Sequence, residues 1–190
     1  DDLILNKPIL LLLPGSRQQE INRHIPIFIK TIKIVRNQVP DLQILIVQAP
    51  HTNFPDLPDY YKISKNLKKA LSVGTAAIVA SGTATLECAI QNIPMVVCYK
   101  LSFFSWVIAK VLVKTEFTSI VNLIAKRAIV PELLQHKMHP HTIANKIIPL
   151  LNKDSSKREI MINELNRLSK DLGLPGVYNR IAQSIIAKDK

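Results

Sequence analysis

Short apolar runs alternate along this sequence with longer segments in which apolar residues recur every three or four positions. Runs without interspersed polar residues are typical of strands buried on both faces, as in parallel sheets covered by helices. Their alternation with helices predicts an α/β fold, a Rossmann-like parallel sheet with helices on both faces. The expected strands are residues 9–13, 42–47, 76–80 and 95–99, and the expected helices are 16–40, 66–71, 83–91, 101–114, 141–151, 157–172 and 177–187.

The remaining segments are predicted to be connections within one domain. Residues 48–62 contain three prolines and are expected to form a loop. Residues 172–176, Leu-Gly-Leu-Pro-Gly, are interpreted as a hinge before the last helix and not as a linker between two cores. We therefore expect a single domain over residues 1–190, with its ligand in the crevice beyond the carboxyl ends of the strands.

The net charge favours an anionic partner. Lysine and arginine number 25 against 14 aspartate and glutamate residues, which gives a formal charge of +11. The basic residues outnumber the acidic ones in every quarter of the chain and form no single arm. Neither a helix-turn-helix pattern nor the exposed aromatics typical of nucleic-acid modules are evident in the sequence, so nucleic acid is not the expected partner.

The two cysteines, the start of the sequence and the lengths of its apolar runs together predict a cytoplasmic location. Cys88 and Cys98 lie in apolar runs, which predicts buried thiols and neither a disulfide nor a catalytic nucleophile. His139 and His141 have no third ligand nearby, so no metal site is expected. The first two residues lack the basic start of a signal peptide, and no apolar run reaches the roughly 18 residues that span a bilayer. The expected location is the cytoplasm.

The first strand-to-helix junction, Leu-Pro-Gly-Ser-Arg-Gln-Gln-Glu at 13–20, allows two interpretations. Ser16 and Gln19 suit a capping box, which explains both residues without a ligand. It does not explain Arg17, because a guanidinium in the first turn faces the positive end of the helix dipole unless an anion lies between them. Such an anion would receive helix N–H groups together with a bidentate arginine. Both interpretations stay open for this junction alone.

The second junction, Ala-Ser-Gly-Thr-Ala-Thr-Leu-Glu at 80–87, raises the same question. Ser81 and Thr83 are helix-capping residues, and Gly82 permits close approach of the backbone to a ligand. Glu87 lies one turn into an apolar helix, either at its exposed edge or against ligand hydroxyls. Two phosphate-competent junctions in one sheet favour a shared phosphate site. Neither matches the G-x-G-x-x-G or Walker patterns, which disfavours hydride transfer and P-loop NTP hydrolysis.

The segment 100–114 combines aromatic and basic residues at helical spacing. One interpretation is a core helix whose lysines extend to solvent. The other is an interfacial helix with aromatics at headgroup depth and lysines on anionic lipid, and the clustering of aromatics favours it. The residues expected to contact the membrane or acyl chains are Phe103, Phe104, Trp106, Val107, Lys110 and Lys114.

These stretches resemble the C-terminal half of the lipid-A-disaccharide synthase family, inverting glycosyltransferases of the B-type fold. The similarity lies in LLPGSRQQEI (12–21), ASGTATLECAIQNIPMVVCYK (80–100), FFSWVIAKVLVKTEFTSIVNLIAKRAIVPELLQ (103–135) and GVYNRIAQSII (176–186), which occur in the family's order. The second stretch has relatives among other nucleotide-sugar enzymes, whereas the third is much more specific.

The resemblance implies a reaction and a set of binding residues. The family transfers 2,3-diacylglucosamine from its UDP derivative to lipid X, 2,3-diacylglucosamine 1-phosphate, giving the disaccharide 1-phosphate and UDP. By matching position, Arg17 would contact the diphosphate, Glu87 the ribose hydroxyls, and Asn122 would help to shape the pocket, without a metal or other cofactor. The residues that would bind the UDP donor are Gly15, Ser16, Arg17, Ser81, Gly82, Thr83, Glu87 and Asn122.

Departures from the family qualify these expectations. The N-terminal acceptor domain, with the expected general base, has no counterpart in this sequence, so no catalytic residue is assigned and the chain is expected to be inactive alone. Helix 177–187 normally crosses back onto that domain, which implies an N-terminal-half partner or a homodimer. Val121 and Lys126 replace the usual proline and glycine. The implied location is peripheral, on the cytoplasmic face of the inner membrane.

Two other functions remain open from the sequence. One is a glycosyltransferase or epimerase of the same architecture that uses another UDP-sugar. The other is a non-catalytic, membrane-associated module that binds UDP-sugars.

Overall fold

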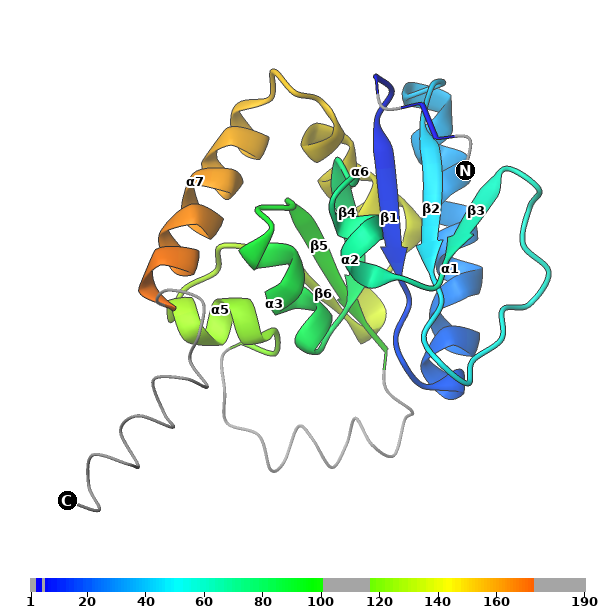
Figure 1. Ribbon diagram of the computed structural model, residues 1–190, viewed down its shortest axis with the longest axis horizontal. Coiled ribbons are helices and arrows are strands. Elements are labelled where there is room, and N and C mark those ends of the chain that lie inside the picture. The colour runs from blue at the N-terminus through cyan, green and yellow to red at the C-terminus, as the bar shows by residue number, and fades with distance from the viewer. Residues whose placement is uncertain (1–2, 5, 101–116, 173–190) are drawn as a thin grey trace, which may run out of the picture.

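The protein folds around one six-stranded parallel sheet, seen in the computed structural model of Figure 1, which describes residues 3–4, 6–100 and 117–172. The strand order is β3-β2-β1-β4-β5-β6, and every neighbouring pair is parallel. This confirms the Rossmann-like α/β prediction. The strands are β1 (Ile9–Leu13), β2 (Gln43–Val47), β3 (Tyr61–Ser64), β4 (Ala76–Ala80), β5 (Met95–Tyr99) and β6 (Glu132–Leu134).

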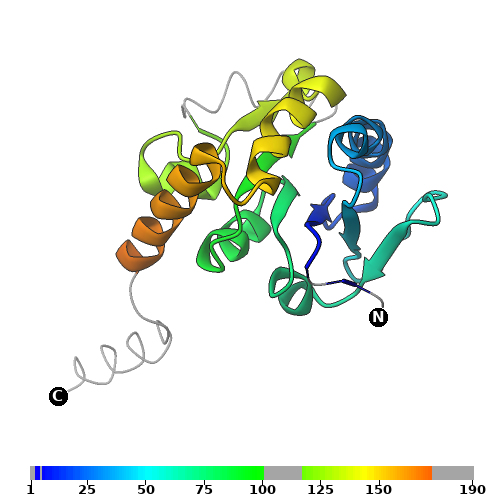
Figure 2. The same cartoon turned by 90° about the horizontal axis from the view of Figure 1, so that it is seen from above.

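Helices cover both faces of this sheet (Figure 2). One face carries α1 and α6, which pack against each other, and the opposite face carries α2 and α3. Helix α7 packs against both α3 and α6, and α5 packs beside α3. The helices are α1 (Gln18–Gln38), α2 (Leu67–Leu71), α3 (Thr83–Ile90), α5 (Ile120–Ala125), α6 (Pro140–Leu151) and α7 (Ser156–Asp171), with a 3₁₀ turn η1 at Gln135–Lys137.

The centre of the core is the pair β1 and β4. All five residues of each strand are buried, as their uninterrupted apolar sequences predict. Leu12 pairs with Ile46 of β2 on one side and with Ile78 of β4 on the other. Strand order therefore reverses between β1 and β4. A parallel sheet places its ligand crevice at such a switch point, beyond the carboxyl ends of the strands.

Three short elements differ from the sequence-based expectation. Strand β3 occupies part of the segment expected to be a loop, and β6 and α5 were not expected at all. β3 lies at the edge of the sheet, where Ile63 is 54% exposed, so it lacks the continuous apolar pattern of the inner strands. β6 has only three residues, too few to show a periodicity. Their positions are fixed by pairing with β2 and β5.

Helix α7 is attached to the amino ends of β4 and β5. Arg158 Nη1 donates to the carbonyl oxygens of Thr75 and Leu150 at 2.7 and 2.6 Å, and the amide of Met95 donates to the sulfur of Met161 at 3.3 Å. This helix therefore closes the end of the sheet opposite the switch-point crevice.

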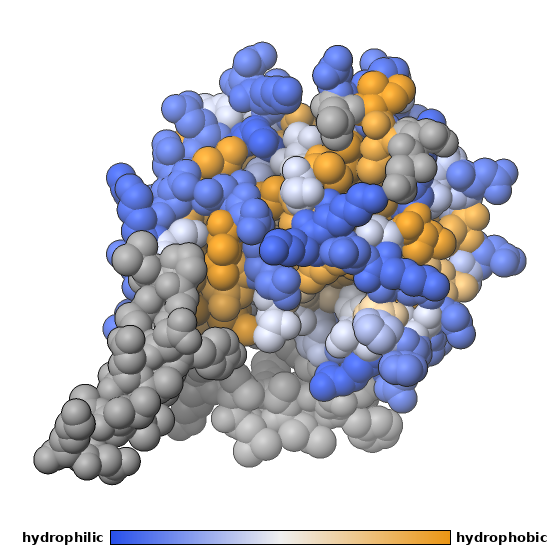
Figure 3. All heavy atoms as spheres, in the orientation of Figure 1, coloured by the Kyte–Doolittle hydropathy of each residue, from blue (hydrophilic) through white to orange (hydrophobic). Residues whose placement is uncertain are grey.

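The surface over α2 and α3 is predominantly polar, with apolar side chains visible between the polar ones (Figure 3). Within the described residues, no helix is both long and apolar enough to cross a membrane. Cys88 and Cys98 are free and buried, as predicted, and burial raises the pKa of the Cys88 thiol to about 12. Neither thiol is therefore ionised near neutral pH.

Candidate functional site

A cavity of about 370 Å³ lies at the carboxyl ends of β1 and β4. The residues that follow each of these strands contribute to its wall, so the two junctions identified in the sequence face the same hollow. A ligand shared between them requires this arrangement. The wall includes Gly15, Ser16 and Arg17 from the first junction, Ser81, Gly82 and Thr83 from the second, and Glu87 from α3.

The second junction presents free backbone donors to this cavity. Gly82 is the N-cap of α3 with φ 145° and ψ −165°, a conformation that L-residues rarely adopt. In the described part of the chain, neither Thr83 nor Ala84 donates its backbone N–H to another group. Such N–H groups, with the positive end of the helix dipole, attract anions.

Ser81 is held in place by the segment that precedes α5. Its Oγ donates to the carbonyl oxygen of Thr118 at 3.2 Å. The hydroxyl proton therefore points toward that carbonyl, and the remaining lone pairs of Oγ are acceptors. This contact joins the β4–α3 junction to a loop 37 positions later in the chain.

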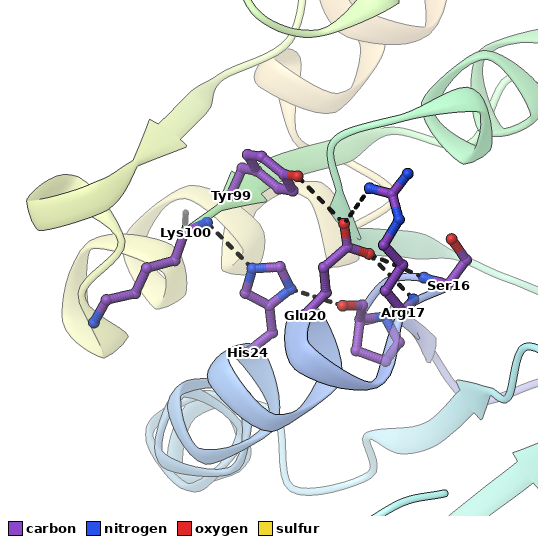
Figure 4. Close-up of polar contacts among 7 residues, drawn as sticks. Ser16, Arg17, Glu20, His24, Tyr99 and Lys100 are labelled. Atoms are coloured by element: carbon purple, nitrogen blue, oxygen red, sulfur yellow. Dashed lines mark hydrogen bonds and ion pairs between the residues drawn. The ribbon is translucent and has the colours of Figure 1, made fainter. Parts of the chain in front are cut away.

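The first junction has a different cap from the one expected. Helix α1 begins at Gln18, with Arg17 as its N-cap, and the capping carboxylate comes from Glu20. The backbone N–H groups of Ser16 and Arg17 both donate to Glu20 Oε2, at 3.2 and 3.3 Å (Figure 4). The predicted capping box between Ser16 and Gln19 is therefore wrong, because Ser16 lies outside the helix and Glu20 is the residue that reaches back.

A second side chain, His24, connects this junction to the end of β5 (Figure 4). His24 is fully buried; its Nδ1 lies 2.7 Å from the carbonyl oxygen of Pro14, and the amide of Lys100 donates to its Nε2 at 3.2 Å. A carbonyl only accepts and an amide N–H only donates, so the ring is neutral with its proton on Nδ1. Burial lowers the pKa of His24; the bond to Pro14 and the charge of Glu20 oppose this, whereas Arg23 and Lys100 reinforce it.

This histidine predicts a pH dependence of stability. The unfolded chain has the ordinary pKa of 6.5 at this residue, and the folded chain a lower one. Below pH 6.5 the unfolded state therefore binds more protons than the folded state. The free energy of unfolding then decreases as the pH is lowered, by up to about 1.4 kcal/mol per pH unit. Urea unfolding between pH 5 and 7.5 measures this slope. His24→Asn should flatten it, and the exposed control His136→Asn should not; an unchanged slope in His24→Asn would exclude His24 as its source.

Other wall residues were not predicted from the sequence. Glu20, Tyr99, Gln48 and Lys65 line the cavity together with the predicted positions. Lys65 directly follows β3, and a residue at the carboxyl end of a strand is a site candidate once that strand is recognised. Glu87 is exposed and lines the cavity one turn into α3.

Asn122, by contrast, does not line this cavity. It is 1% exposed, and its carbonyl oxygen accepts from the amides of Ile129 and Val130 at 2.8 and 3.0 Å. Its amide group donates to the carbonyl of Val130 at 2.8 Å and to Glu132 Oε1 at 2.7 Å. These bonds give Asn122 a structural role in the 119–132 segment.

Glu132 completes this structural cluster. Its carboxylate accepts from the amide and hydroxyl groups of both Thr118 and Ser119 as well as from Asn122. Burial alone would raise the pKa of Glu132, but the bonds from Thr118 and Ser119 hold it below its ordinary value. The cluster holds the loop whose Thr118 carbonyl accepts from the Ser81 hydroxyl.

Several predictions fall outside the described residues. The proposed membrane contacts, Phe103, Phe104, Trp106, Val107, Lys110 and Lys114, lie in the segment 101–116, and the expected crossover helix 177–187 lies in 173–190. Within residues 3–4, 6–100 and 117–172, no group of three or more His, Cys, Asp and Glu side chains is placed to hold a metal ion.

Solved structures share this architecture at low sequence identity. A glycosyltransferase, SnogD from Streptomyces nogalater, is 14% identical with a TM-score of 0.61, over 98% of this chain and 45% of that one. The spinosyn rhamnosyltransferase SpnG, solved with thymidine diphosphate, is 16% identical with a TM-score of 0.57, over 86% of this chain and 41% of that one. These similarities establish one half of a B-type glycosyltransferase fold.

Sequence relatives are more specific. Lipid-A-disaccharide synthase of Coxiella burnetii is 31% identical over 97% of this chain and 50% of that protein. Lipid-A-disaccharide synthase 1 of Legionella pneumophila is 37% identical over 90% of this chain and 46% of that protein. The chain thus spans about half the length of these relatives. The family model described as lipid-A-disaccharide synthetase matches residues 2–180. The chain belongs to the lipid-A-disaccharide synthetase family.

Proposed function

We propose that this chain is the UDP-sugar-binding half of a lipid-A-disaccharide synthase. In this reaction the 6-hydroxyl of lipid X attacks the anomeric carbon of UDP-2,3-diacylglucosamine. The bond from that carbon to the diphosphate breaks, UDP leaves with the electron pair, and the hydroxyl proton passes to a base. The observation that carries the proposal is that the two strand-to-helix junctions line one cavity at the switch point of the sheet.

The cavity supplies what a diphosphate leaving group needs. Negative charge accumulates on UDP as the glycosidic bond breaks. The N-terminus of α3 offers unpaired N–H donors to it, and Arg17 adds a guanidinium that is 79% exposed and therefore free to turn toward a ligand. Glu87 lies one turn farther along α3, where its carboxylate would accept hydrogen bonds from the ribose hydroxyls. In this proposal the N-terminus of α3 and Arg17 offset the negative charge of the diphosphate, and no metal ion is invoked.

The general base and the acceptor site belong, in this proposal, to an N-terminal half. Inverting transfer requires a base within hydrogen-bond reach of the attacking hydroxyl. Such a half would be a separate partner or the remainder of a longer polypeptide, and a homodimer is the alternative arrangement. The acylated substrates place the enzyme at the cytoplasmic surface of the inner membrane, with the segment around Phe103 and Trp106 as the proposed contact.

Calorimetry on the 190-residue chain tests the binding half of this proposal. We expect saturable binding of UDP, and no disaccharide when the chain alone is incubated with UDP-2,3-diacylglucosamine and lipid X. Addition of an N-terminal half should restore product formation, measured by thin-layer chromatography. A chain that binds no uridine nucleotide would contradict the proposal, and turnover by the chain alone would show that it contains its own base.

A donor screen separates the proposed substrate from related ones. UDP-2,3-diacylglucosamine should be used by the reconstituted enzyme, whereas UDP-N-acetylglucosamine, which lacks the long acyl chains, should not. Equal use of both donors would favour another UDP-sugar glycosyltransferase of the same architecture.

A further inference from the structure

The carboxylate of Glu20 occupies the anion-binding end of α1. Oε2 accepts from the amides of Ser16 and Arg17, at 3.2 and 3.3 Å. Oε1 accepts from Arg17 Nη1 at 3.4 Å and from the hydroxyl of Tyr99 at 3.2 Å (Figure 4). The side chain of Glu20 is only 12% exposed, against 79% for Arg17. The largely covered carboxylate is held by four donors, whereas, among the described residues, the exposed guanidinium is held only by its 3.4 Å contact with Glu20.

The amides that the two junctions place at the cavity are therefore not equivalent. The amides of Ser16 and Arg17 are already hydrogen-bonded, whereas those of Thr83 and Ala84 have no partner in the described part of the chain. A ligand can reach the former only by displacing a carboxylate that Tyr99 and Arg17 also hold. A ligand can reach the amides of Thr83 and Ala84 without displacing a protein group that the structure describes.

Building on the proposed function, we propose that Glu20 is a positioning residue. It holds the amides of Ser16 and Arg17, which precede the first turn of α1, and anchors the Arg17 guanidinium at the cavity, so that the diphosphate binds the N-terminus of α3 and Arg17. The first junction then contributes the Arg17 side chain and not the amides of Ser16 and Arg17. This differs from the expectation that both junctions present their amides to the phosphates.

Two neighbours of Glu20 are suited to this role. A Cβ at Gly15 would lie 2.5 Å from Oε2 and 2.9 Å from Cβ of Glu20, so glycine at this position leaves the space that the carboxylate occupies. Gly15 also has φ 122°, which favours glycine independently. Tyr99 comes from the end of β5; burial and the charge of Glu20 both raise its pKa, so the hydroxyl remains a donor.

A double-mutant cycle between Arg17 and Glu20 tests the proposal. UDP and uridine are the two probes, because their affinity ratio isolates the phosphate contacts. Glu20→Gln removes the charge that anchors the guanidinium, and should weaken UDP binding about 5- to 10-fold with uridine affinity unchanged. In the Arg17→Ala background the same substitution should have no further effect on UDP. Tyr99→Phe should give a smaller loss, about 2- to 3-fold.

A matched control and a ligand-free readout complete the design. Glu159→Gln removes an exposed first-turn carboxylate from α7 and should leave both affinities unchanged. In ¹⁵N-resolved NMR, UDP should shift the amide signals of Thr83 and Ala84 more than those of Ser16 and Arg17. Without any ligand, Glu20→Gln should shift the Ser16 and Arg17 signals.

The outcomes that overturn this inference are distinct from failure of the proposed function. Tighter UDP binding by Glu20→Gln would mean that the carboxylate competes with the phosphates. Equal losses for UDP and uridine would indicate a purely structural role, and additive losses in the double variant would show that Glu20 does not act through Arg17. A wild-type chain that binds neither probe would contradict the proposed function, and the ligand-free signals of Ser16 and Arg17 would still test the Glu20 cap.

Discussion

Replacement of Arg17 by alanine is expected to weaken UDP binding about 100-fold and to leave the melting temperature unchanged. Hydrogen bonds between a guanidinium and phosphate oxygens are charge-assisted and contribute about 1.5–3 kcal/mol each, so the two bonds of one bidentate contact correspond, at the lower end of this range, to about two orders of magnitude in Kd. The side chain is 79% exposed, and its contact with Glu20 is a single 3.4 Å ion pair. Its removal therefore leaves no buried group without a partner.

Calorimetry with UDP measures the affinity, and thermal unfolding measures the stability. Lys30→Ala is the matched control, because it removes the same charge from an exposed position farther along α1. The control separates loss of a specific contact from a lower net charge, which would weaken the binding of any anion. An Arg17→Ala variant with wild-type affinity would remove Arg17 from the site, and an equal loss in Lys30→Ala would mean that only the overall charge matters.

The inner part of the fold could be predicted from the sequence because burial on both faces leaves a local signature. β1 and β4 are continuous apolar runs, and each is followed by a helix with a regular apolar face. The edge strand β3 and the short β6 carry no such signature, since their positions depend on pairing with strands distant in sequence. The strand order, and with it the switch point between β1 and β4, was likewise not a local property.

The candidate site was predictable where local chemistry implied it. Gly82 and its neighbours at the start of α3 were identified from their residue types, and they line the cavity. Glu20 was missed because a Ser and a Gln at capping-box spacing offered a simpler explanation. Tyr99 reaches the site from 79 positions away, a relation that no local pattern contains. Lys126, noted as a departure from a usual glycine, has φ 52°, which explains the preference for glycine there.

Asn122 was expected from the resemblance to help shape the donor pocket, and the contacts that the structure gives its side chain lie in the segment that leads into β6. Its side chain completes four hydrogen bonds to residues 129–132, and none of them reaches the cavity. The segment that it closes connects α5 to β6, and it is too irregular to satisfy its own backbone groups. Buried backbone N–H and C=O groups need hydrogen-bond partners, and here the Asn122 side chain supplies the partners that a neighbouring strand would supply in a regular sheet.

Asn122→Ala should therefore lower the free energy of unfolding by about 3–5 kcal/mol and leave the UDP affinity of the folded molecules unchanged. The substitution leaves the amide and the carbonyl of Val130 without partners, at about 1–3 kcal/mol for each buried group, and leaves the Ile129 amide only its bond to the Arg127 carbonyl. Urea unfolding followed by circular dichroism measures the loss. The control, Asn37→Ala at an exposed position of α1, should stay within about 0.5 kcal/mol of wild type.

If Asn122→Ala leaves too little folded protein to titrate, Asn122→Asp provides the same test. It keeps the acceptor for Ile129 and Val130 but places a second carboxylate against Glu132. Repulsion raises the pKa of the pair in the folded state, so the variant should regain stability as the pH falls toward 5. If folded Asn122 variants bound UDP more weakly and were as stable as wild type, Asn122 would belong to the ligand site and its structural role would be refuted.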